Sequence, residues 1–404
     1  MKALLLNFNL KGVGTYRRTF YFSRELARRG CDATMITVSQ TSQYRARTYY
    51  KRDWIGESET PSGPGPWVRV IEGPAVGYKW LPGWGSGPLD IWQRIREICT
   101  GNYDVVYGFE YHPNVAWPVY LTRQKEYRFF SDWCDWFAGQ SNLFRGIKLA
   151  HRIDAFFEER IRLLAEKVSV TSCVLRDRAL SLGIPHERIV HIPEGAATDY
   201  VQPLDSREMR LRLGLPRDRP VIGAVRNCDM VQETRVAAEV LKQVPDALFL
   251  FVGKSSPRAM ALASQLGIKE HILNTGWVTD EDYPRYLACA DVYFLPLQDA
   301  LFDRARWPAK ILDFLAAGRP VVTNPVGDVG PLFWENELGR VVGYQDEDFA
   351  TAIVELLHNP KLARSLGENG RRVMVEQWDW RLRGEQIARV VGLSAERASQ
   401  KGAC

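Results

Sequence analysis

The sequence lacks the cysteine and histidine clusters of zinc sites and the paired cysteines of disulfide-rich domains. Its seven cysteines are scattered, no C-x-x-C motif occurs, and the chain has six histidines. This usage supports neither a structural zinc site nor a disulfide framework, and a reducing cytoplasm is its simplest setting. No apolar run approaches the roughly 18 residues of a membrane-spanning helix, and residues 3–6 are too short for a signal peptide. We therefore expect a cytoplasmic protein without a metal site or a membrane span.

Charge and length bound the architecture. Lys and Arg total 53 against 48 Asp and Glu, a net charge of +5. This mild excess permits contact with phosphorylated ligands or an anionic membrane but requires neither. A chain of 404 residues with 46% apolar and 25% charged residues has the composition of a globular protein and the length of two ordinary domains.

Strand and helix patterns alternate through both halves of the chain. Residues 2–8 predict a strand, 16–29 a helix ended by Gly30, and 33–38 the next strand, which together make one βαβ unit. Further predicted strands lie at 220–225, 247–253, 291–297 and 320–323. The alternation predicts an α/β chain of two doubly wound, Rossmann-like domains.

One segment of the second half combines a loop, a helix and a buried strand. Residues 303–328 read DRARWPAKILDFLAAGRPVVTNPVGD, in which Pro308 suits the first turn of a helix and Gly318 its left-handed end. Residues 320–323 follow as an apolar strand that ends in a loop. This order presents a helix N-terminus and its charged neighbours to a crevice, which suits a phosphate-bearing ligand.

This segment resembles the signature of retaining glycosyltransferase family 4 (glycosyl transferases group 1), whose members have the GT-B fold. The likeness lies in an acid on the helix, Asp313, followed by A-x-G-x-P-V-V and a glycine-containing loop. The family's helix acid holds the ribose of a nucleotide-sugar, so the resemblance gives Asp313 that role. A second acid usually stands eight residues earlier, where this chain has Ala305, and Asp303 is its candidate replacement. Gly327 and Asp328 lie in a loop expected to touch the sugar or phosphate.

The resemblance covers nearly the whole chain and implies further donor contacts. Arg226, after the strand at 220–225, matches the arginine that grips the diphosphate, where positive charge stabilises the leaving group. The usual lysine partner is missing, since Val231 or Gln232 stands there, and Lys310 of the P-x-K sequence is its expected replacement. Family members sandwich the nucleobase between two loops, which match Trp277, Val278, Pro296 and Leu297. For Asp313, simple capping or solvation of a surface helix remains an alternative.

A glycine loop follows the first strand. Gly12-x-Gly14 is not the dinucleotide fingerprint, because Arg17 stands where the third glycine is needed. Such a pattern is often only a tight turn. Family 4 carries a glycine loop at this point, close to the donor diphosphate and the acceptor, and so the backbone at Gly14 is expected to approach the donor.

Two strand ends of the first half carry polar residues. Glu110 and His112 follow one buried strand, and Asp132 and Asp135 follow the next. Ligands bind at the carboxyl ends of strands in open α/β sheets, and in the resembled family a histidine or acid there faces the reacting sugar or the acceptor. A carboxylate at this place can accept the hydroxyl proton of the acceptor. The alternatives are a structural turn histidine for His112 and helix capping for the aspartates.

Residues 41–92 are rich in tyrosine, tryptophan, glycine and proline, with interleaved arginines. We favour a loop-rich insertion whose aromatic side chains pack on the domain. The alternative is an acceptor-binding flap or peripheral contact with the inner face of the membrane, where Trp and Tyr lie at the interface and Arg or Lys meet phosphates. No nucleic-acid-binding module is recognisable, and no nucleic-acid partner is expected.

With the resemblance, the chain is expected to form a GT-B fold with two domains facing a central cleft. The predicted parts are an acceptor-side domain at 1–198, a nucleotide-sugar-binding domain at 199–377 and a helix at 378–404 that returns to the first domain. The implied activity is retaining transfer of a sugar from a nucleotide-diphosphate sugar to a hydroxyl of a glycan, a lipid-linked acceptor or a small molecule.

No cofactor or metal is expected beyond this donor, because cationic side chains can do a metal's electrostatic work. Two alternatives to the transferase remain open. One is a non-catalytic nucleotide-sugar-binding protein on the same scaffold, suggested by the missing lysine and first acid. The other is a different GT-B enzyme, such as a sugar-nucleotide epimerase.

Overall fold

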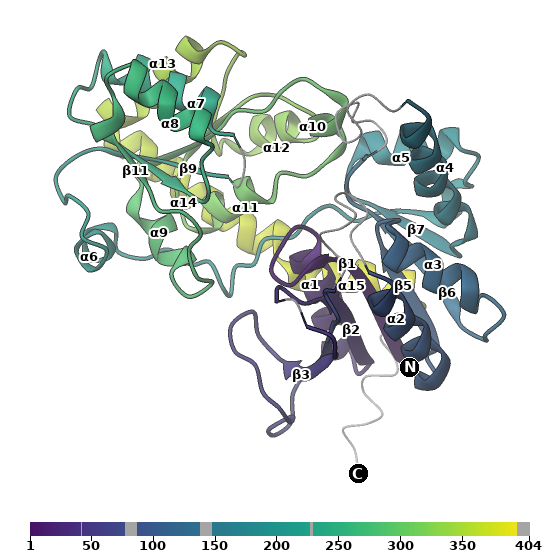
Figure 1. The fold of residues 1–404 in the computed structure, drawn as a ribbon. Helices are drawn as coiled ribbons and strands as arrows, with labels where there is room; N and C mark the ends of the chain where they lie inside the picture. Colours follow the sequence, from purple (N-terminus) through teal and green to yellow (C-terminus); the bar gives the residue numbers. More distant parts are fainter. Residues whose placement is uncertain (42, 77–86, 138–147, 227–228, 394–404) are drawn as a thin grey trace. The chain divides into compact units, whose positions relative to one another are not determined.

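The computed structural model describes residues 1–41, 43–76, 87–137, 148–226 and 229–393, and of residues 148–154 only the backbone. The chain divides into two compact units (Figure 1). The first consists of Met1–Glu194, Ala305–Trp307 and Trp380–Cys404, and the second of Gly195–Arg304 and Pro308–Asp379. Apart from residues 305–307, the chain passes from the first unit to the second after Glu194 and returns after Asp379. We expected these boundaries after 198 and 377.

The first unit is built on an eight-stranded sheet with the order β3-β4-β2-β1-β5-β6-β7-β8. Neighbouring strands are parallel except for β3 and β4, which pair antiparallel. The strands are β1 (Lys2–Leu10), β2 (Asp32–Val38), β3 (Arg47–Lys51), β4 (Val68–Gly73), β5 (Val105–Phe109), β6 (Arg128–Trp133), β7 (Lys167–Val170) and β8 (Ile189–His191). The strand order reverses between β1 and β5, so the loops after these strands lie at a topological switch point, where such sheets bind ligands.

The helices of the first unit include one from the far end of the chain. They are α1 (Tyr16–Arg28), α2 (Pro88–Gly101), α3 (Pro113–Thr122), α4 (Lys148–Leu164), α5 (Cys173–Ser181) and α15 (Trp380–Val390). Figure 1 shows α15, in yellow, beside α1. The Trp380 ring stacks on Tyr21 at 5.2 Å between centroids, and a guanidinium nitrogen of Arg29 donates to the Arg381 carbonyl at 3.2 Å.

The aromatic stretch at 41–92 is only partly as expected. We expected a loop-rich insertion, but it contains the strands β3 and β4. The sequence does not predict them, because each is a short alternating segment beside a Pro/Gly-rich turn region and finds its partner only in the folded sheet. The expected packing of its aromatic side chains is confirmed for two residues. Tyr49 and Trp54 are buried, and Trp54 stacks on Tyr21 at 5.9 Å. Residues 77–86 of this stretch lie outside the described residues.

The second unit is built on a six-stranded parallel sheet with the order β11-β10-β9-β12-β13-β14. Its strands are β9 (Val221–Val225), β10 (Leu248–Val252), β11 (Ile272–Asn274), β12 (Val292–Leu295), β13 (Val321–Thr323) and β14 (Gly339–Val341). Its helices are α6 (Ser206–Arg212), α7 (Val231–Leu241), α8 (Pro257–Gln265), α9 (Tyr283–Cys289), α10 (Leu301–Ala305), α11 (Ala309–Ala316), α12 (Val329–Asn336), α13 (Asp346–His358) and α14 (Pro360–Val373). The order reverses between β9 and β12, which defines a second switch point.

The segment at 303–328 follows the predicted order with one correction. Helix α11 begins directly after Pro308, and Gly318 takes a left-handed φ of 71° after the helix, as expected. The polar loop predicted before Pro308 is wrong in part, because residues 301–305 form the short helix α10.

The α/β class of two doubly wound units is confirmed by the topology of both sheets. Within the described part of the chain, no helix combines the length and the apolar character needed to cross a bilayer.

Candidate functional site

Arg226 lies at the switch point of the second unit, directly after β9. One of its guanidinium nitrogens donates to the carboxylate of Glu233 on α7 at 2.9 Å, and the other donates to the carbonyl of Pro296 at 3.0 Å. Pro296 follows β12, so the arginine bridges the two strand ends that flank the switch point. Burial raises the pKa of Glu233, although Arg226 opposes this shift. The contacts hold a cation in a defined orientation at the carboxyl edge of the sheet.

The two loops predicted to bind the nucleobase differ in hydrogen bonding and exposure. The backbone N–H of Leu297 donates to the side-chain oxygen of Asn324 at 2.8 Å, and the Pro296 carbonyl accepts from Arg226. Both backbone groups therefore have partners inside the unit. Trp277 is 52% exposed and Val278 is half-buried after β11. Base binding by these four residues stays a prediction.

Asp313 and Lys310 on α11 meet at a tyrosine that sequence reasoning did not single out. The hydroxyl of Tyr283 on α9 donates to the Asp313 carboxylate at 2.9 Å and accepts from the Lys310 ammonium at 3.2 Å. The ammonium nitrogen lies 3.9 Å from the Asp313 carboxylate. Asp313 is fully buried, so the alternative of a solvated surface acid is wrong. Asp313, predicted to bind the ribose, and Lys310, predicted to bind the diphosphate, thus form one cluster with Tyr283. No local sequence motif around Tyr283 predicts these contacts.

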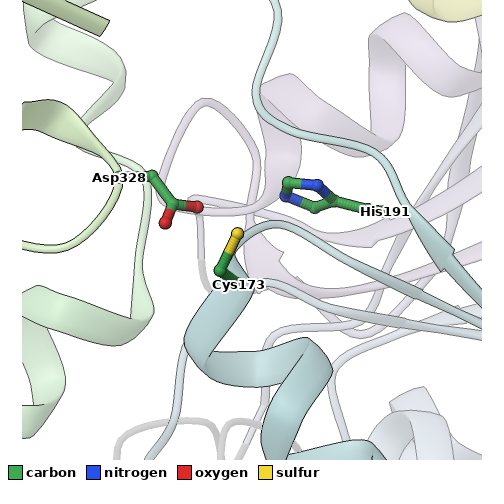
Figure 2. Close-up of side chains that lie close together, drawn as sticks. All are labelled: Cys173, His191 and Asp328. Carbon is green, nitrogen blue, oxygen red and sulfur yellow. The ribbon is translucent and has the colours of Figure 1, made fainter. Parts of the chain in front are cut away.

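The remaining donor candidates occupy α10 and the loop after β13. The Asp303 carboxylate is nearly buried and accepts the backbone N–H of Gln298 at 2.8 Å. Gly327 has a φ of 57°, and a Cβ there would lie 2.6 Å from the Arg304 carbonyl oxygen, so only glycine fits. Asp328 precedes α12 and is half-buried (Figure 2). Their contacts with a donor stay predictions.

Figure 2 also shows two side chains of the first unit that the sequence analysis did not assign. Cys173 lies at the start of α5, and His191 ends β8. A ring nitrogen of His191 lies 3.2 Å from the Thr171 carbonyl oxygen, which orients the imidazole.

The glycine loop of the first unit is tied to its sheet. Gly14 has a φ of 54°, and a Cβ there would approach the side-chain nitrogen of Asn9 to 2.1 Å. The hydroxyl of the next residue, Thr15, donates to the buried Asn7 side chain at 2.7 Å. Asn7 in turn donates to the Thr37 hydroxyl at 2.9 Å, which joins β1 to β2. The loop is therefore fixed, and its approach to a donor stays a prediction.

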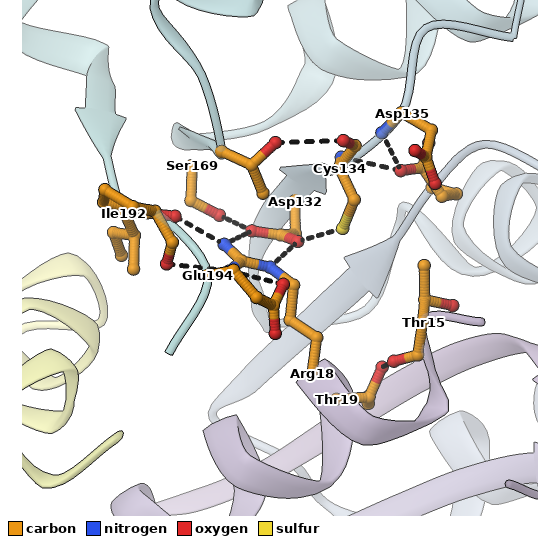
Figure 3. A network of polar contacts seen from close by, with 12 residues as sticks. Thr15, Arg18, Thr19, Asp132, Cys134, Asp135, Ser169, Ile192 and Glu194 are labelled. Carbon is orange, nitrogen blue, oxygen red and sulfur yellow. Dashed lines mark hydrogen bonds and ion pairs between the residues drawn. The ribbon is translucent and has the colours of Figure 1, made fainter. Parts of the chain in front are cut away.

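Asp132 is the centre of a buried polar network in the first unit (Figure 3). Its carboxylate accepts two bonds from Arg18 of α1, at 2.7 and 2.9 Å, and a third from the thiol of Cys134 at 2.8 Å. The hydroxyl of Ser169 on β7 also donates to it. Burial lowers the pKa of Arg18, but Asp132 and other nearby groups outweigh this and hold it above its ordinary value. Asp132 lies within β6, so the helix-capping alternative is wrong for it, and its catalytic role stays a prediction.

Glu194 extends this network, and the sequence analysis did not single it out. Its carboxylate lies 3.6 Å from the Arg18 guanidinium. Arg18 also donates to the carbonyls of Ile192 and Pro193 at 2.9 and 3.1 Å. Burial raises the pKa of Glu194 to about 7, against the effect of Arg18. An acid in the loop that follows β8 was the available signal.

Glu110 and His112 follow β5, at the switch point of the first unit. One Glu110 oxygen accepts the backbone N–H groups of Cys134 and Asp135, and the other accepts from Arg162 of α4 at 3.0 Å. Burial raises the pKa of Glu110 to about 8, although Arg162 opposes this shift.

His112 is buried at the position before α3 and stacks on Phe8 with 3.7 Å between ring centroids. Burial, and then the charge of Arg162, lower its pKa to about 3, so the imidazole is neutral at pH 7. Asp135 is half-buried beyond β6, and residues 138–147 after it lie outside the described residues. Catalytic roles for Glu110, His112 and Asp135 stay predictions.

Both units are those of a GT-B glycosyltransferase scaffold. Residues 12–195 match the family model described as "Glycosyl transferase 4-like domain", and residues 221–359 match the one described as "Glycosyl transferases group 1". The chain therefore belongs to the group 1 glycosyltransferases of the family-4 type.

Curated relatives match parts of the chain. It is 32% identical over 250 residues to a GDP-mannose-dependent alpha-(1-6)-phosphatidylinositol monomannoside mannosyltransferase of Mycolicibacterium smegmatis, which covers 59% of this chain and 64% of that protein. It is 28% identical over 251 residues to an MMP alpha-(1->4)-mannosyltransferase of Mycolicibacterium hassiacum, with 60% and 57% covered. The matched region thus spans less than two thirds of the length of these relatives.

A solved structure agrees with the fold. Sucrose-phosphate synthase from Thermosynechococcus elongatus has a TM-score of 0.73 to this chain at 19% sequence identity, with 96% of this chain and 98% of that chain covered. At this identity the likeness concerns the fold alone, and the predicted GT-B class is confirmed.

Proposed function

We propose that this protein is a retaining glycosyltransferase that moves a sugar from a nucleotide-diphosphate sugar to a hydroxyl acceptor. The observation that carries the proposal is Arg226, held between Glu233 and the Pro296 carbonyl at the switch point of the second unit. A diphosphate leaving group gains negative charge as the glycosidic bond breaks, and a preoriented cation stabilises that charge. Membership of the group 1 family supports the same reaction.

Each donor group has a proposed contact. Arg226 and Lys310 bind the diphosphate, and Asp313, oriented by the Tyr283 hydroxyl, accepts hydrogen bonds from the ribose. The departing diphosphate remains on the face of the sugar that the acceptor hydroxyl attacks, so the anomeric configuration is retained. The two cationic side chains make a bound metal unnecessary for charge stabilisation.

We propose GDP-mannose as the donor and a lipid-linked sugar as the acceptor. The support is the name of the Mycolicibacterium smegmatis relative, a GDP-mannose-dependent enzyme that acts on phosphatidylinositol monomannoside.

A nucleotide screen tests the donor site. We expect GDP and GDP-mannose, among GDP, UDP, ADP and dTDP and their sugar conjugates, to stabilise the protein by about 2.7 kcal/mol at a hundred times the dissociation constant, since ligand binding to the native state adds to stability. Asp313→Asn should weaken this binding by about 1.5–3 kcal/mol through loss of charge-assisted hydrogen bonds. Thermal shift and calorimetric titration measure both effects.

The exposed variant Asp218→Asn is the matched control and should bind as the wild type does. No shift with any nucleotide would contradict the donor site. Nucleotide-sugar binding with neither transfer nor donor hydrolysis would contradict the proposed enzyme and support the alternative of a non-catalytic nucleotide-sugar-binding protein.

We also propose that the first unit contacts an anionic membrane through aromatic side chains on three helices. Trp92 of α2 is 56% exposed with the Arg96 guanidinium 5.6 Å from its ring, and Phe156 of α4 is 53% exposed with Arg160 at 5.0 Å. Trp117 of α3 is also exposed. Aromatic rings beside arginines suit the headgroup region, where each basic residue adds about 1 kcal/mol of attraction to anionic lipid.

Vesicle flotation tests this surface. We expect the wild type to float with phosphatidylcholine vesicles that contain phosphatidylglycerol, and to lose most of this binding in Trp92→Ala/Trp117→Ala. Trp334→Ala, which removes an exposed tryptophan of the second unit, is the control and should float normally. Equal flotation of the double variant and the wild type would rule out membrane contact through Trp92 and Trp117.

A further inference from the structure

The side chain of Glu110 holds the loop that follows β6. Strand β6 ends at Trp133, and the next two backbone N–H groups, of Cys134 and Asp135, both donate to one oxygen of Glu110 at 2.7 and 3.0 Å. One carboxylate oxygen therefore accepts both N–H groups at the start of the loop that carries Asp135, and we call this arrangement the Glu110 clasp. The backbone N–H of Glu110 itself donates to the Asp132 carbonyl at 3.1 Å, so the two strand ends are joined in both directions.

The backbone at Glu110 is in a conformation that disfavours a glutamate. Its φ is 67°, in the left-handed region that glycine adopts without cost and that few longer residues occupy. Such a conformation persists when surrounding contacts over-determine it, and it is common at functional sites. A glutamate at this position indicates that the carboxylate contacts outweigh the backbone strain.

Arg162 binds the other oxygen of the Glu110 carboxylate. It donates to the second Glu110 oxygen at 3.0 Å and to the carbonyl of Asp132 at 2.9 Å, and both side chains of the ion pair are fully buried. A buried pair held by several hydrogen bonds favours a single arrangement of the groups around it. The arginine thus fixes the clasp and the end of β6 together.

We infer that Glu110 is a positioning residue, which sets the place of Asp135 relative to the acceptor and does not itself exchange a proton with the substrate. This inference rests on the proposed function and deepens its acceptor side. Glu110 acts through the backbone of residues 134–135, and Arg162 acts through Glu110. It reassigns the role predicted for Glu110 from the sequence, while Asp135 remains the candidate group that touches the acceptor.

Kinetics of Glu110→Gln test the inference. Glutamine keeps an acceptor oxygen but loses the charge that pairs with Arg162, so the clasp loosens. We expect transfer to fall on the order of 100-fold, because an ångström of misplacement has an effect of that size. The dissociation constant for the donor nucleotide should stay within about twofold, because the proposed side-chain contacts with the diphosphate and the ribose lie in the second unit. The effect should appear in the acceptor KM and kcat.

A double-mutant cycle with Asp135→Asn separates positioning from general damage. If Glu110 acts by placing Asp135, the two losses are not additive, and the double variant transfers about as slowly as the slower single variant. Additive losses would overturn the inference, as would a loss of transfer that tracks weaker nucleotide binding. Glu166→Gln, which breaks an exposed ion pair with Arg128 in the same unit, is the control and should transfer normally.

Amide hydrogen exchange tests the role of Glu110 without measuring activity, so it can be read even if the proposed function is wrong. In Glu110→Gln, amide hydrogen exchange at Cys134 and Asp135 should speed up at least tenfold relative to the other amides of the first unit, because a neutral glutamine oxygen accepts these N–H groups more weakly than a carboxylate does. Unchanged exchange would overturn the inference. Absence of transfer in the wild type, with these amides deprotected in the variant, would instead count against the proposed function alone.

Discussion

Replacing Asp132 by asparagine is expected to lower the free energy of unfolding by about 3–5 kcal/mol, because it leaves the Arg18 guanidinium buried without its counter-ion. Arg18 is 2% exposed and Asp132 is fully buried. The remaining acid, Glu194, lies 3.6 Å from Arg18 and compensates in part, which favours the lower end of the range. Urea unfolding of the full chain measures the loss as a lower midpoint at constant slope.

The matched control for this substitution is Asp177→Asn. Asp177 is 65% exposed and pairs with the neighbouring Arg176 at 3.0 Å, so its replacement should change stability by less than about 1 kcal/mol. The double variant Arg18→Met/Asp132→Asn removes both charges of this ion pair and should recover part of the lost stability. A loss for Asp132→Asn no larger than for the control would show that the network is hydrated in solution.

Replacing Arg226 by alanine should lower kcat by about 10²–10³-fold, the effect of removing one preoriented donor from a site of developing negative charge. The variant should also bind the nucleotide more weakly. Arg226→Lys should recover only part of the rate, because an ammonium lacks the fork that reaches Glu233 and the Pro296 carbonyl together. Steady-state transfer and nucleotide titration measure the two effects.

The control for this substitution removes an arginine of the same unit from a surface ion pair. Arg235 pairs with Asp346 at 2.6 Å and is 48% exposed, so Arg235→Ala should transfer sugar at the wild-type rate. Thermal melting of Arg226→Ala shows whether Glu233, left buried without its partner, unfolds the unit. A folded Arg226→Ala protein with a rate within threefold of wild type would contradict the placement of the diphosphate.

The sequence predicted features set by neighbouring residues better than those set by distant ones. Buried parallel strands such as Leu248–Val252 are continuous apolar runs, and Pro308 and Gly318 mark helix ends by their backbone preferences. Helix α3 was missed, because Pro118 inside it interrupts the helical pattern. Strands β3 and β4 were missed because each is short and gains its stability only from its neighbour.

The candidate site residues were chosen by residue type and by their place after predicted strands, and their partners in the fold were not predicted. Asp132 and Arg18 are 114 positions apart, and Tyr283 and Asp313 are 30 apart, so no local pattern joins them. Glu110 was predicted as a polar residue at a strand end, but its left-handed backbone and its contacts with Cys134 and Asp135 depend on the packing of β5 against β6. Pairings of this kind arise only when the sheet has formed.

The return of α15 to the first unit has a consequence for how the chain is made. Trp380 is fully buried against Tyr21, and the Arg18 guanidinium lies 5.9 Å from its ring. A ribosome that adds about 5–20 residues per second releases the first sheet long before it reaches this helix. The part of the protein synthesised first is therefore completed last, and its α1 surface stays uncovered while the whole second unit is translated.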